Sequence, residues 1–164
     1  MIKLIVLDVD GTLTNGKITY TNSGDEIKSF DVKDGLAIAS WNRLKGKSAI
    51  ITGRSSKIVE KRANDLKIDF VYQGVKDKKE ILLKIIDELN LDKSEVAVIG
   101  DDLNDLGMFE LIPHSFAPKD ASSYIKEKAK TTLSKNGGDG AVREMIELIL
   151  KQDNRYKEFL DLWH

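Results

Sequence analysis

The chain has 164 residues, of which 41% are hydrophobic and 32% charged, with a formal net charge of -1 and no cysteine. This composition is typical of a globular protein, and we expect a single domain over residues 1–164. The nearly neutral charge argues against nucleic acid or a membrane surface as a partner, because both need a basic excess. The lack of cysteine excludes disulfides, thiolate metal sites and cysteine nucleophiles, and favours a cytoplasmic location. No apolar stretch approaches the length of a membrane span, and the one at the N-terminus is too short for a signal peptide.

The first predicted element is a strand over Ile2–Leu7, an almost continuous apolar run typical of a strand buried on both faces. Alternating segments at 16–20 and 26–31 flank a glycine-containing turn and predict a β-hairpin. Helices are then expected over 34–43, 55–66, 78–89, a segment ending near 111, and 121–128, with strands at 48–52, 70–72, 96–100, 114–117 and 131–133. Strands that alternate with helices in this order predict an α/β fold with a doubly wound parallel sheet and a hairpin insert after the first strand.

Two segments near the C-terminus complete this prediction. The glycine-rich segment at 136–140 predicts a flexible hinge, followed by a helix with buried positions at Val142, Met145, Ile146, Ile149 and Leu150. The final segment, 155–163, has the pattern of a short amphipathic helix. Its apolar face either docks on another subunit or belongs to a frayed tail.

Acidic and polar residues follow several of the predicted strands at the point where each strand ends. They are Asp8 and Asp10 after the first strand, Thr52 after the second, and Asp101, Asp102 and Asp105 after the fourth, while Lys78 opens the intervening helix. Because parallel strands end at the same edge of a sheet, we expect these side chains to converge there. Taken alone, the first pair also fits two loop aspartates that cap a turn. A calcium loop is excluded, because its spacing would place Val6 where a carboxylate ligand is required.

Converging carboxylates repel one another, and a hard divalent cation with oxygen ligands, Mg²⁺ as the first candidate, relieves that repulsion. The residue types also suggest roles in phosphoryl transfer. Asp8 is ionised at neutral pH and is a candidate nucleophile that forms an aspartyl-phosphate. Asp10 is the candidate general acid and base, and Thr52 and Lys78 are candidate ligands of the phosphoryl oxygens.

In these stretches the sequence resembles the haloacid dehalogenase superfamily of phosphatases. Four motifs occur in the family's order: Asp8-Val-Asp-Gly-Thr-Leu-Thr14, Thr52-Gly53, Lys78, and Gly100-Asp-Asp-Leu-Asn-Asp105. The resemblance implies a Rossmann-like fold and an Mg²⁺ ion held by Asp8, by the backbone carbonyl of Asp10, and by Asp101. It implies a supporting role for Asp102 and Asp105.

Many members of the superfamily carry a cap domain, but the gaps after the first and second motifs leave no room for one here. An open site admits water, so either the substrate is large or a neighbouring subunit closes the site. The exposed hairpin at Gly16–Asp31, with Tyr20 and Phe30, is the expected association surface.

Nearly the whole chain resembles the capless sugar-acid phosphatases of the superfamily. The matching stretches are Gly16-Lys-Ile-Thr-Tyr20, Phe30-Asp-Val-Lys-Asp-Gly35, Ile51-Thr-Gly-Arg54, Tyr72-Gln-Gly74, Gly100-Asp-Asp-Leu103 and Gly137-Gly-Asp-Gly-Ala-Val-Arg-Glu144. This resemblance implies hydrolysis of 3-deoxy-D-manno-octulosonate 8-phosphate in lipopolysaccharide biosynthesis. It also implies a homotetramer built through the hairpin, and a glycine-hinged tail that reaches an adjacent site.

A sugar acid phosphate presents two anions, so a second cationic group is needed besides Lys78, and arginine suits a planar carboxylate. The resemblance assigns substrate contacts to Arg54, Arg62, Lys33 and Gly53, although a solvated position is the ordinary alternative for both arginines. Lys33 and Asp139 depart from the family, which often has arginine at both positions. Phosphatases of nine-carbon sugar acid 9-phosphates tend to have glutamate where this chain has Arg54, so Arg54 favours the eight-carbon substrate.

Two functions of other classes remain as alternatives. A receiver-type regulatory domain also gathers aspartates, a threonine and a lysine, but its acidic pair and its phosphoacceptor follow different strands. A catalytically idle subunit that serves as an oligomeric scaffold is the second alternative. Magnesium-dependent release of phosphate from small phosphomonoesters distinguishes the enzyme from both.

Overall fold

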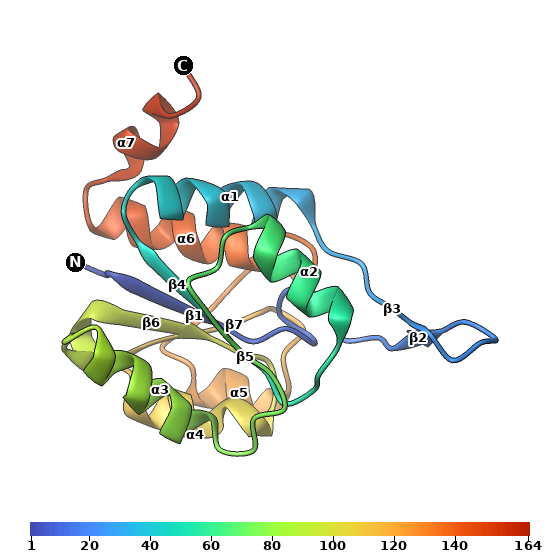
Figure 1. Ribbon diagram of the computed structural model, residues 1–164. Helices are drawn as coiled ribbons and strands as arrows, with labels where there is room; N and C mark the ends of the chain where they lie inside the picture. Colours follow the sequence, from blue (N-terminus) through green and yellow to red (C-terminus); the bar gives the residue numbers. More distant parts are fainter.

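The computed structural model describes residues 1–164 and contains a six-stranded sheet with helices on both faces (Figure 1). The strand order is β5-β4-β1-β6-β7-β8, and every pairing in it is parallel. The strands are β1 (Leu4–Leu7), β4 (Lys47–Ile51), β5 (Phe70–Tyr72), β6 (Val96–Ile99), β7 (His114–Ala117) and β8 (Thr131–Thr132). The helices are α1 (Val32–Arg43), α2 (Lys57–Asp65), α3 (Lys78–Glu88), α4 (Leu106–Leu111), α5 (Ser123–Lys128), α6 (Ala141–Gln152) and α7 (Tyr156–Asp161). The predicted fold class is confirmed.

Strand β1 lies inside the sheet, between β4 and β6, and all of its residues are buried. Its first residue, Leu4, pairs with Lys47 of β4 and Val96 of β6. Side chains alternate along a strand, so Ile5 and Leu7 join the core on one face of the sheet while Leu4 and Val6 join the core on the other. This register brings the carboxyl ends of β1, β4 and β6 to one edge, which is where open α/β sheets bind ligands.

Helices α1, α2 and α6 cover one face of the sheet, and α3, α4 and α5 cover the other (Figure 1). Trp41 of α1 is fully buried in the first core, and its indole Nε1 donates to the carbonyl oxygen of Lys47 at 2.8 Å. That bond satisfies the only polar atom of a large apolar side chain, so Trp41 fixes α1 against β4 without leaving a donor unpaired.

Side-chain caps determine where the helices begin. Asp31 caps α1, Ser56 caps α2 and Asp77 caps α3, so that Lys78 is the first residue of α3. Helix α6 is capped from another element: the backbone N–H of Arg143 donates to Asp34 Oδ1 at 2.8 Å. The other oxygen of Asp34 is buried without a partner, and burial raises the pKa of this carboxyl to about 6 despite the bond from Arg143.

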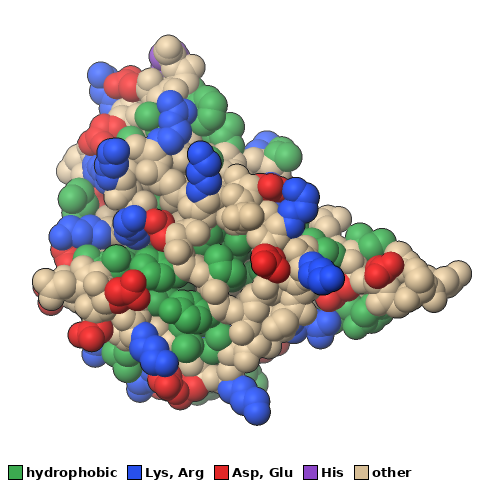
Figure 2. Space-filling view, viewed as in Figure 1, with side chains coloured by type: hydrophobic (Ala, Val, Ile, Leu, Met, Phe, Trp, Pro, Cys, Tyr) green, Lys and Arg blue, Asp and Glu red, His purple; other side chains and the backbone are tan.

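The predicted hairpin forms as β2 (Thr19–Tyr20) and β3 (Glu26–Ile27), which pair antiparallel and lie outside the main sheet. It projects from the body of the molecule (Figure 1) and carries hydrophobic side chains on its surface (Figure 2). Ile18, Tyr20 and Ile27 are exposed, Tyr20 by 61%. An exposed apolar surface on a narrow projection is the kind of surface that partner chains cover.

The glycine-rich segment at 136–140 is not the predicted flexible hinge. Gly137 is buried, and a Cβ atom built on it would lie 1.8 Å from the carbonyl oxygen of Gly11. The backbone N–H of Gly138 donates to the carbonyl oxygen of Thr12 at 2.9 Å. The prediction was wrong because glycine permits close packing as well as flexibility, and here it allows two backbones to touch.

The chain's final helix docks on its own subunit. Phe159 of α7 is buried in the same core as α1 and α6, and the indole N–H of Trp163 donates to Ser40 Oγ at 3.2 Å. The segment is therefore not a frayed tail, because Phe159 anchors it in the core, while Leu160 and Trp163 stay exposed by 42% and 54%. Among the helices of the structure, none combines the length and the apolar character needed to cross a membrane.

Candidate active site

Three carboxylates meet at the carboxyl edge of the sheet. Asp8 follows β1, Asp101 follows the neighbouring strand β6, and Asp105 lies one turn further on, directly before α4. One oxygen of each lies within 4.8 Å of the others, the spacing of ligands around a single metal ion. Together with Lys78 we call these residues the inner cluster. The predicted convergence of Asp8, Asp101 and Lys78 is what the structure shows.

Lys78 is the one cation of the inner cluster. Its ammonium donates to Asp8 Oδ1 at 2.7 Å and to Asp105 Oδ1 at 2.6 Å, and its side chain is 1% exposed. The second oxygen of Asp105 accepts from the backbone N–H groups of Asp101, at 2.9 Å, and Asp102, at 3.3 Å. Asp105 is therefore a brace that fixes both Lys78 and the loop bearing Asp101.

The inner cluster contains more carboxylates than ammonium groups, so its negative charge is not balanced within the chain. Burial, followed by the charge of Asp105, raises the pKa of Asp8 to about 6, although Lys78 opposes the shift. Burial and the charges of Asp8 and Asp105 raise the pKa of Asp101 to about 8. Hard oxygen donors with excess negative charge are what Mg²⁺ and similar cations bind, so the donor set fits such an ion.

Gly11 allows Asp101 to approach the loop after β1. A Cβ atom at position 11 would lie 1.8 Å from Asp101 Oδ2, and the backbone there has a φ of +90. Both observations require glycine, since any side chain would push Asp101 away from Asp8. The glycine of the first motif is thus needed for the geometry of the acidic cluster.

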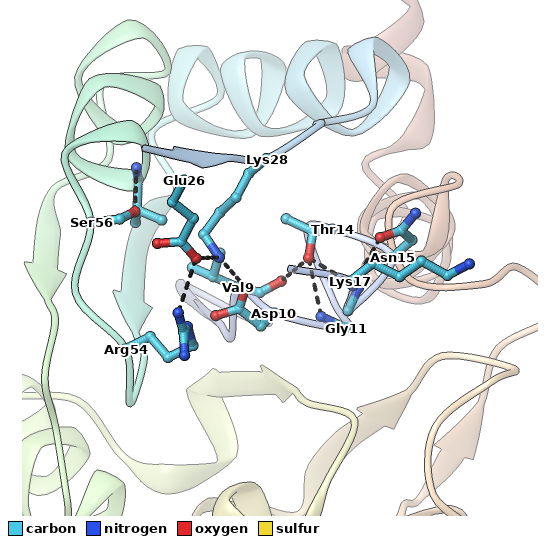
Figure 3. A network of polar contacts seen from close by, with 12 residues as sticks. Val9, Asp10, Gly11, Thr14, Asn15, Lys17, Glu26, Lys28, Arg54 and Ser56 are labelled. Atoms are coloured by element: carbon cyan, nitrogen blue, oxygen red, sulfur yellow. Dashed lines mark hydrogen bonds and ion pairs between the residues drawn. The ribbon is translucent and has the colours of Figure 1, made fainter. Parts of the chain in front are cut away.

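Asp10 belongs to a second group of charges, the outer network, which consists of Asp10, Lys28, Glu26 and Arg54. Lys28 donates to Asp10 Oδ1 and to Glu26 Oε1, the latter at 3.1 Å, and Arg54 donates to Glu26 Oε1 at 3.1 Å (Figure 3). Burial would lower the pKa of Lys28, but its bonds to Asp10 and Glu26 outweigh burial and raise it. The hairpin thereby supplies two side chains to the edge of the site.

A small cavity of about 90 Å³ lies between the inner cluster and the outer network. Its lining residues are Asp8, Asp10, Thr52, Gly53, Arg54 and Asn104. Thr52 is 2% exposed and occupies the end of β4. Of the residues predicted for the phosphate and its surroundings, Thr52, Gly53 and Arg54 are therefore at the cavity, next to Asp8.

The structure places three other predicted residues away from this cavity. Arg62 donates to the carbonyl oxygen of Asp31 at 3.3 Å and packs over Phe30, so it holds the start of α1. Lys33 lines a different depression, together with Arg143 and Asp139. Asp102 is exposed and caps the turn that follows it, accepting from the N–H of Leu103 at 2.8 Å.

Sequence reasoning missed Lys28, Glu26 and Asn104. The alternation at 26–31 indicated that Glu26 and Lys28 share one face of a strand, but it gave no indication of what that face contacts. Asn104 lies inside the fourth motif, among the carboxylates that define it. Its position one residue before Asp105 was the feature of the sequence that could have indicated a place at the site.

The fold and the inner cluster define a haloacid dehalogenase-like hydrolase, the family whose sequence profile matches residues 71–146. The 3-deoxy-D-manno-octulosonate 8-phosphate phosphatase KdsC of Haemophilus influenzae is 37% identical over 158 residues, 96% of this chain and 88% of that protein. The corresponding phosphatase of Yersinia pestis is 40% identical over 149 residues, 91% of this chain and 80% of that protein. The chain belongs to this KdsC family of phosphoric monoester hydrolases.

Solved structures agree with this assignment. The Moraxella catarrhalis phosphatase, in complex with a magnesium ion, a phosphate ion and a KDO molecule, superposes with a TM-score of 0.95 and 38% identity, covering 99% of this chain and 94% of that one. The cobalt-bound Haemophilus influenzae phosphatase gives a TM-score of 0.92 and 37% identity over 96% of this chain and 92% of that one. The predicted superfamily and the resemblance to its sugar-acid phosphatases are confirmed.

Proposed function

We propose that this chain is a magnesium-dependent phosphomonoesterase that hydrolyses 3-deoxy-D-manno-octulosonate 8-phosphate to the free sugar acid and phosphate, in lipopolysaccharide biosynthesis. The observation that carries the proposal is the inner cluster beside an open cavity at the carboxyl edge of the sheet. The close relatives of that specificity, and the one solved with magnesium, phosphate and KDO, support the choice of substrate and cation.

The residues that would hold Mg²⁺ are Asp8, Asp101 and the backbone carbonyl of Asp10. The bound ion would supply positive charge against the phosphoryl oxygens. For Asp8 and Asp101, the spacing of their oxygens and the excess of carboxylates over ammonium groups in the inner cluster support this assignment, whereas the Asp10 carbonyl is assigned from the resemblance to the superfamily. Asp105 is engaged with Lys78 and two backbone N–H groups, which leaves it a supporting position.

The reaction proceeds in two displacements. The carboxylate of Asp8 attacks phosphorus, the bond between phosphorus and the sugar oxygen breaks, and Asp10 gives its proton to that oxygen. Asp10 then takes a proton from water, which attacks the aspartyl-phosphate and releases inorganic phosphate and free Asp8. Lys78 and the hydroxyl of Thr52 stabilise the negative charge on the phosphoryl oxygens.

The sugar binds outside the cavity. A volume of about 90 Å³ is well below the roughly 300–1,000 Å³ of pockets that enclose a small-molecule ligand, so the cavity suits the phosphoryl group alone. Arg54 lines the cavity and is 45% exposed, which suits a contact with the sugar carboxylate. Arg62 and Lys33 lie outside the cavity of their own subunit. We therefore propose that they contact only a substrate bound in the site of a neighbouring subunit.

We further propose a cytoplasmic homotetramer of a single-domain chain, assembled through the hairpin at Gly16–Asp31. The support is the projection of the hairpin and the exposure of Ile18, Tyr20 and Ile27 on it. A neighbouring subunit placed on this surface would cover apolar area and close an otherwise open site.

The deciding experiment measures kcat/KM with Mg²⁺ for a panel of phosphorylated sugar acids, comparing the eight-carbon 8-phosphate with nine-carbon 9-phosphates. We expect the eight-carbon substrate to be preferred, chelation to abolish turnover, and Asp8→Asn to lose at least about 10³-fold in kcat. Preference for a nine-carbon substrate would overturn the substrate assignment. Full activity in Asp8→Asn would overturn the nucleophile, and a stable phosphoprotein without turnover would favour the receiver-like alternative.

A further inference from the structure

Lys28 is an unusual residue for an exposed hairpin. Its side chain is 1% exposed, although it follows directly after the short strand β3, on a projection that is mostly accessible to solvent. Lysine is rarely buried unless its charge is paired, because removing the ammonium from water is costly. Here the ammonium is paired twice, with Asp10 Oδ1 and with Glu26 Oε1.

The contact fixes one oxygen of Asp10 and leaves the other free. Lys28 binds Oδ1, and no side chain or backbone group of the chain donates to Oδ2. The carboxyl group of Asp10 lines the cavity beside Asp8 and is 21% exposed. One oxygen is therefore held while the other stays available to a molecule in the cavity, as an acid that serves a leaving group requires.

Glu26 holds Lys28 in turn. Its Oε1 accepts from Lys28 and from Arg54, each at 3.1 Å, so the lysine lies between two carboxylates, one of which Arg54 also holds (Figure 3). A lysine side chain has several rotatable bonds, and an ammonium paired on two sides keeps its place better than one paired on one side. The outer network is thus built to hold the Asp10 carboxyl group in one orientation.

We infer that Lys28 is a positioning residue for Asp10, which brings the β-hairpin of the same subunit into the active site. The inference rests on the proposed function, in which Asp10 gives its proton to the leaving oxygen. Misplacement of a general acid by about 1 Å costs on the order of 10²-fold in rate. The loss should fall on substrates whose leaving group needs that proton and should spare substrates whose leaving group does not.

Benzyl phosphate and p-nitrophenyl phosphate separate these cases. Both place a small aromatic ring on the phosphoryl group and neither carries a carboxylate for Arg54. Benzyl alcohol leaves as a strongly basic oxygen that must be protonated, whereas p-nitrophenolate leaves without a proton. The parameter to compare is kcat/KM, because it reports the steps through cleavage of the bond to the leaving oxygen.

In Lys28→Met we expect kcat/KM for benzyl phosphate to fall by about 30- to 100-fold and that for p-nitrophenyl phosphate by less than about 5-fold. Lys28→Arg should recover part of the loss, because it restores a cation beside Asp10. Glu26→Gln removes the negative charge from one of the two anchors of Lys28 and should show the same bias at smaller size. The matched control is Lys17→Met on the same hairpin, because the Lys17 side chain is exposed and forms no ion pair, and both rates should stay unchanged.

Equal losses for both substrates in Lys28→Met would overturn the inference, because they indicate a lysine that only anchors the hairpin or binds the phosphoryl group directly. If Lys28→Met does not fold, judged by circular dichroism and solution mass, the ratio of the two rates in Glu26→Gln decides in the same way. A wild-type enzyme that hydrolyses neither substrate nor any sugar acid phosphate would overturn the proposed function itself. Equal losses in an active enzyme overturn only the role of Lys28.

Discussion

The inner cluster and the outer network lie on two sides of one cavity, and they differ in charge balance. The inner cluster sets three carboxylates against the one ammonium of Lys78, and its members are largely buried. The outer network sets two carboxylates against Lys28 and Arg54, and Arg54 is 45% exposed. The inner cluster therefore has an excess of negative charge that a bound cation would balance, whereas the outer network is already neutral and holds Asp10.

Asp34, a buried carboxyl group outside both the inner cluster and the outer network, shows how far burial alone explains the inner cluster. Its pKa is raised to about 6, chiefly by burial, and the bond from the Arg143 N–H opposes the shift. Asp101 combines burial with the charges of Asp8 and Asp105, and its pKa is raised to about 8. The crowding of carboxylates therefore adds to burial at Asp101, which is the situation that a bound cation relieves.

The largest effect on stability should come from removing the one cation of the inner cluster. Lys78→Met leaves Asp8 and Asp105 buried without their ammonium partner, and we expect the free energy of unfolding to fall by about 3–5 kcal/mol. The loss should be smaller at pH 5.5 than at pH 8, because the carboxylates can take up protons. Urea unfolding followed by tryptophan fluorescence measures it, since Trp41 is fully buried.

In the outer network, Arg54→Met is the substitution to compare with Lys78→Met, because it also replaces a cation by methionine. Because Arg54 is partly exposed, its loss should lower the free energy of unfolding by less than about 1 kcal/mol. Equal destabilisation by the two substitutions would remove the distinction between a buried, uncompensated cluster and a balanced, accessible one.

Divalent cations should stabilise the protein through the inner cluster. Mg²⁺ at about 100 times its dissociation constant should add about 2.7 kcal/mol to the free energy of unfolding, which is several degrees in Tm. Asp101→Asn should abolish the shift, whereas Asp102→Asn should retain it, because the Asp102 side chain caps a turn outside the cluster. Differential scanning calorimetry with and without Mg²⁺ tests both variants, and an equal shift in Asp101→Asn would place the cation elsewhere.

The pH dependence that Asp34 contributes is a smaller effect than the shift expected from Mg²⁺. Its folded-state pKa of about 6 exceeds the usual 3.8, so the folded chain binds the proton more tightly and stability falls as the pH rises through 6. From pH 5 to pH 8 the wild type should lose about 1.4 kcal/mol relative to Asp34→Asn. Unfolding curves of both proteins at the two pH values measure this difference, and parallel pH profiles would show that burial alone does not shift this carboxyl group.

Much of the inner cluster could be located from local sequence patterns. Apolar runs at 2–7 and 96–99 predict buried parallel strands, and parallel strands place the residues that follow them at one edge of the sheet. Asp8, Thr52, Lys78 and Asp101 come together for that reason. Their roles in binding and catalysis stay predictions that the experiments above address.

The contacts of the outer network could not be predicted from sequence in this way. The hairpin does not pair with the main sheet, so no strand register predicts which of its side chains faces Asp10. Arg62 holds the start of α1 in its own subunit, so its predicted contact with the substrate depends on a neighbouring subunit. The prediction of a flexible hinge at Gly137 and Gly138 was wrong because the sequence shows that these residues lack side chains, but it does not show which part of the chain packs against them.

The order of the elements, the sheet and the group of acids at its edge can all be predicted from sequence, because they follow from periodicity and from the direction of parallel strands. Three contacts are visible only in the folded chain: Lys28 reaches Asp10, Gly137 touches Gly11, and the last helix docks on its own subunit through Phe159. Each of those contacts joins segments that no hydrogen-bonded strand ladder connects. Their geometry depends on how the complete chain packs, and local pattern carries no information about it.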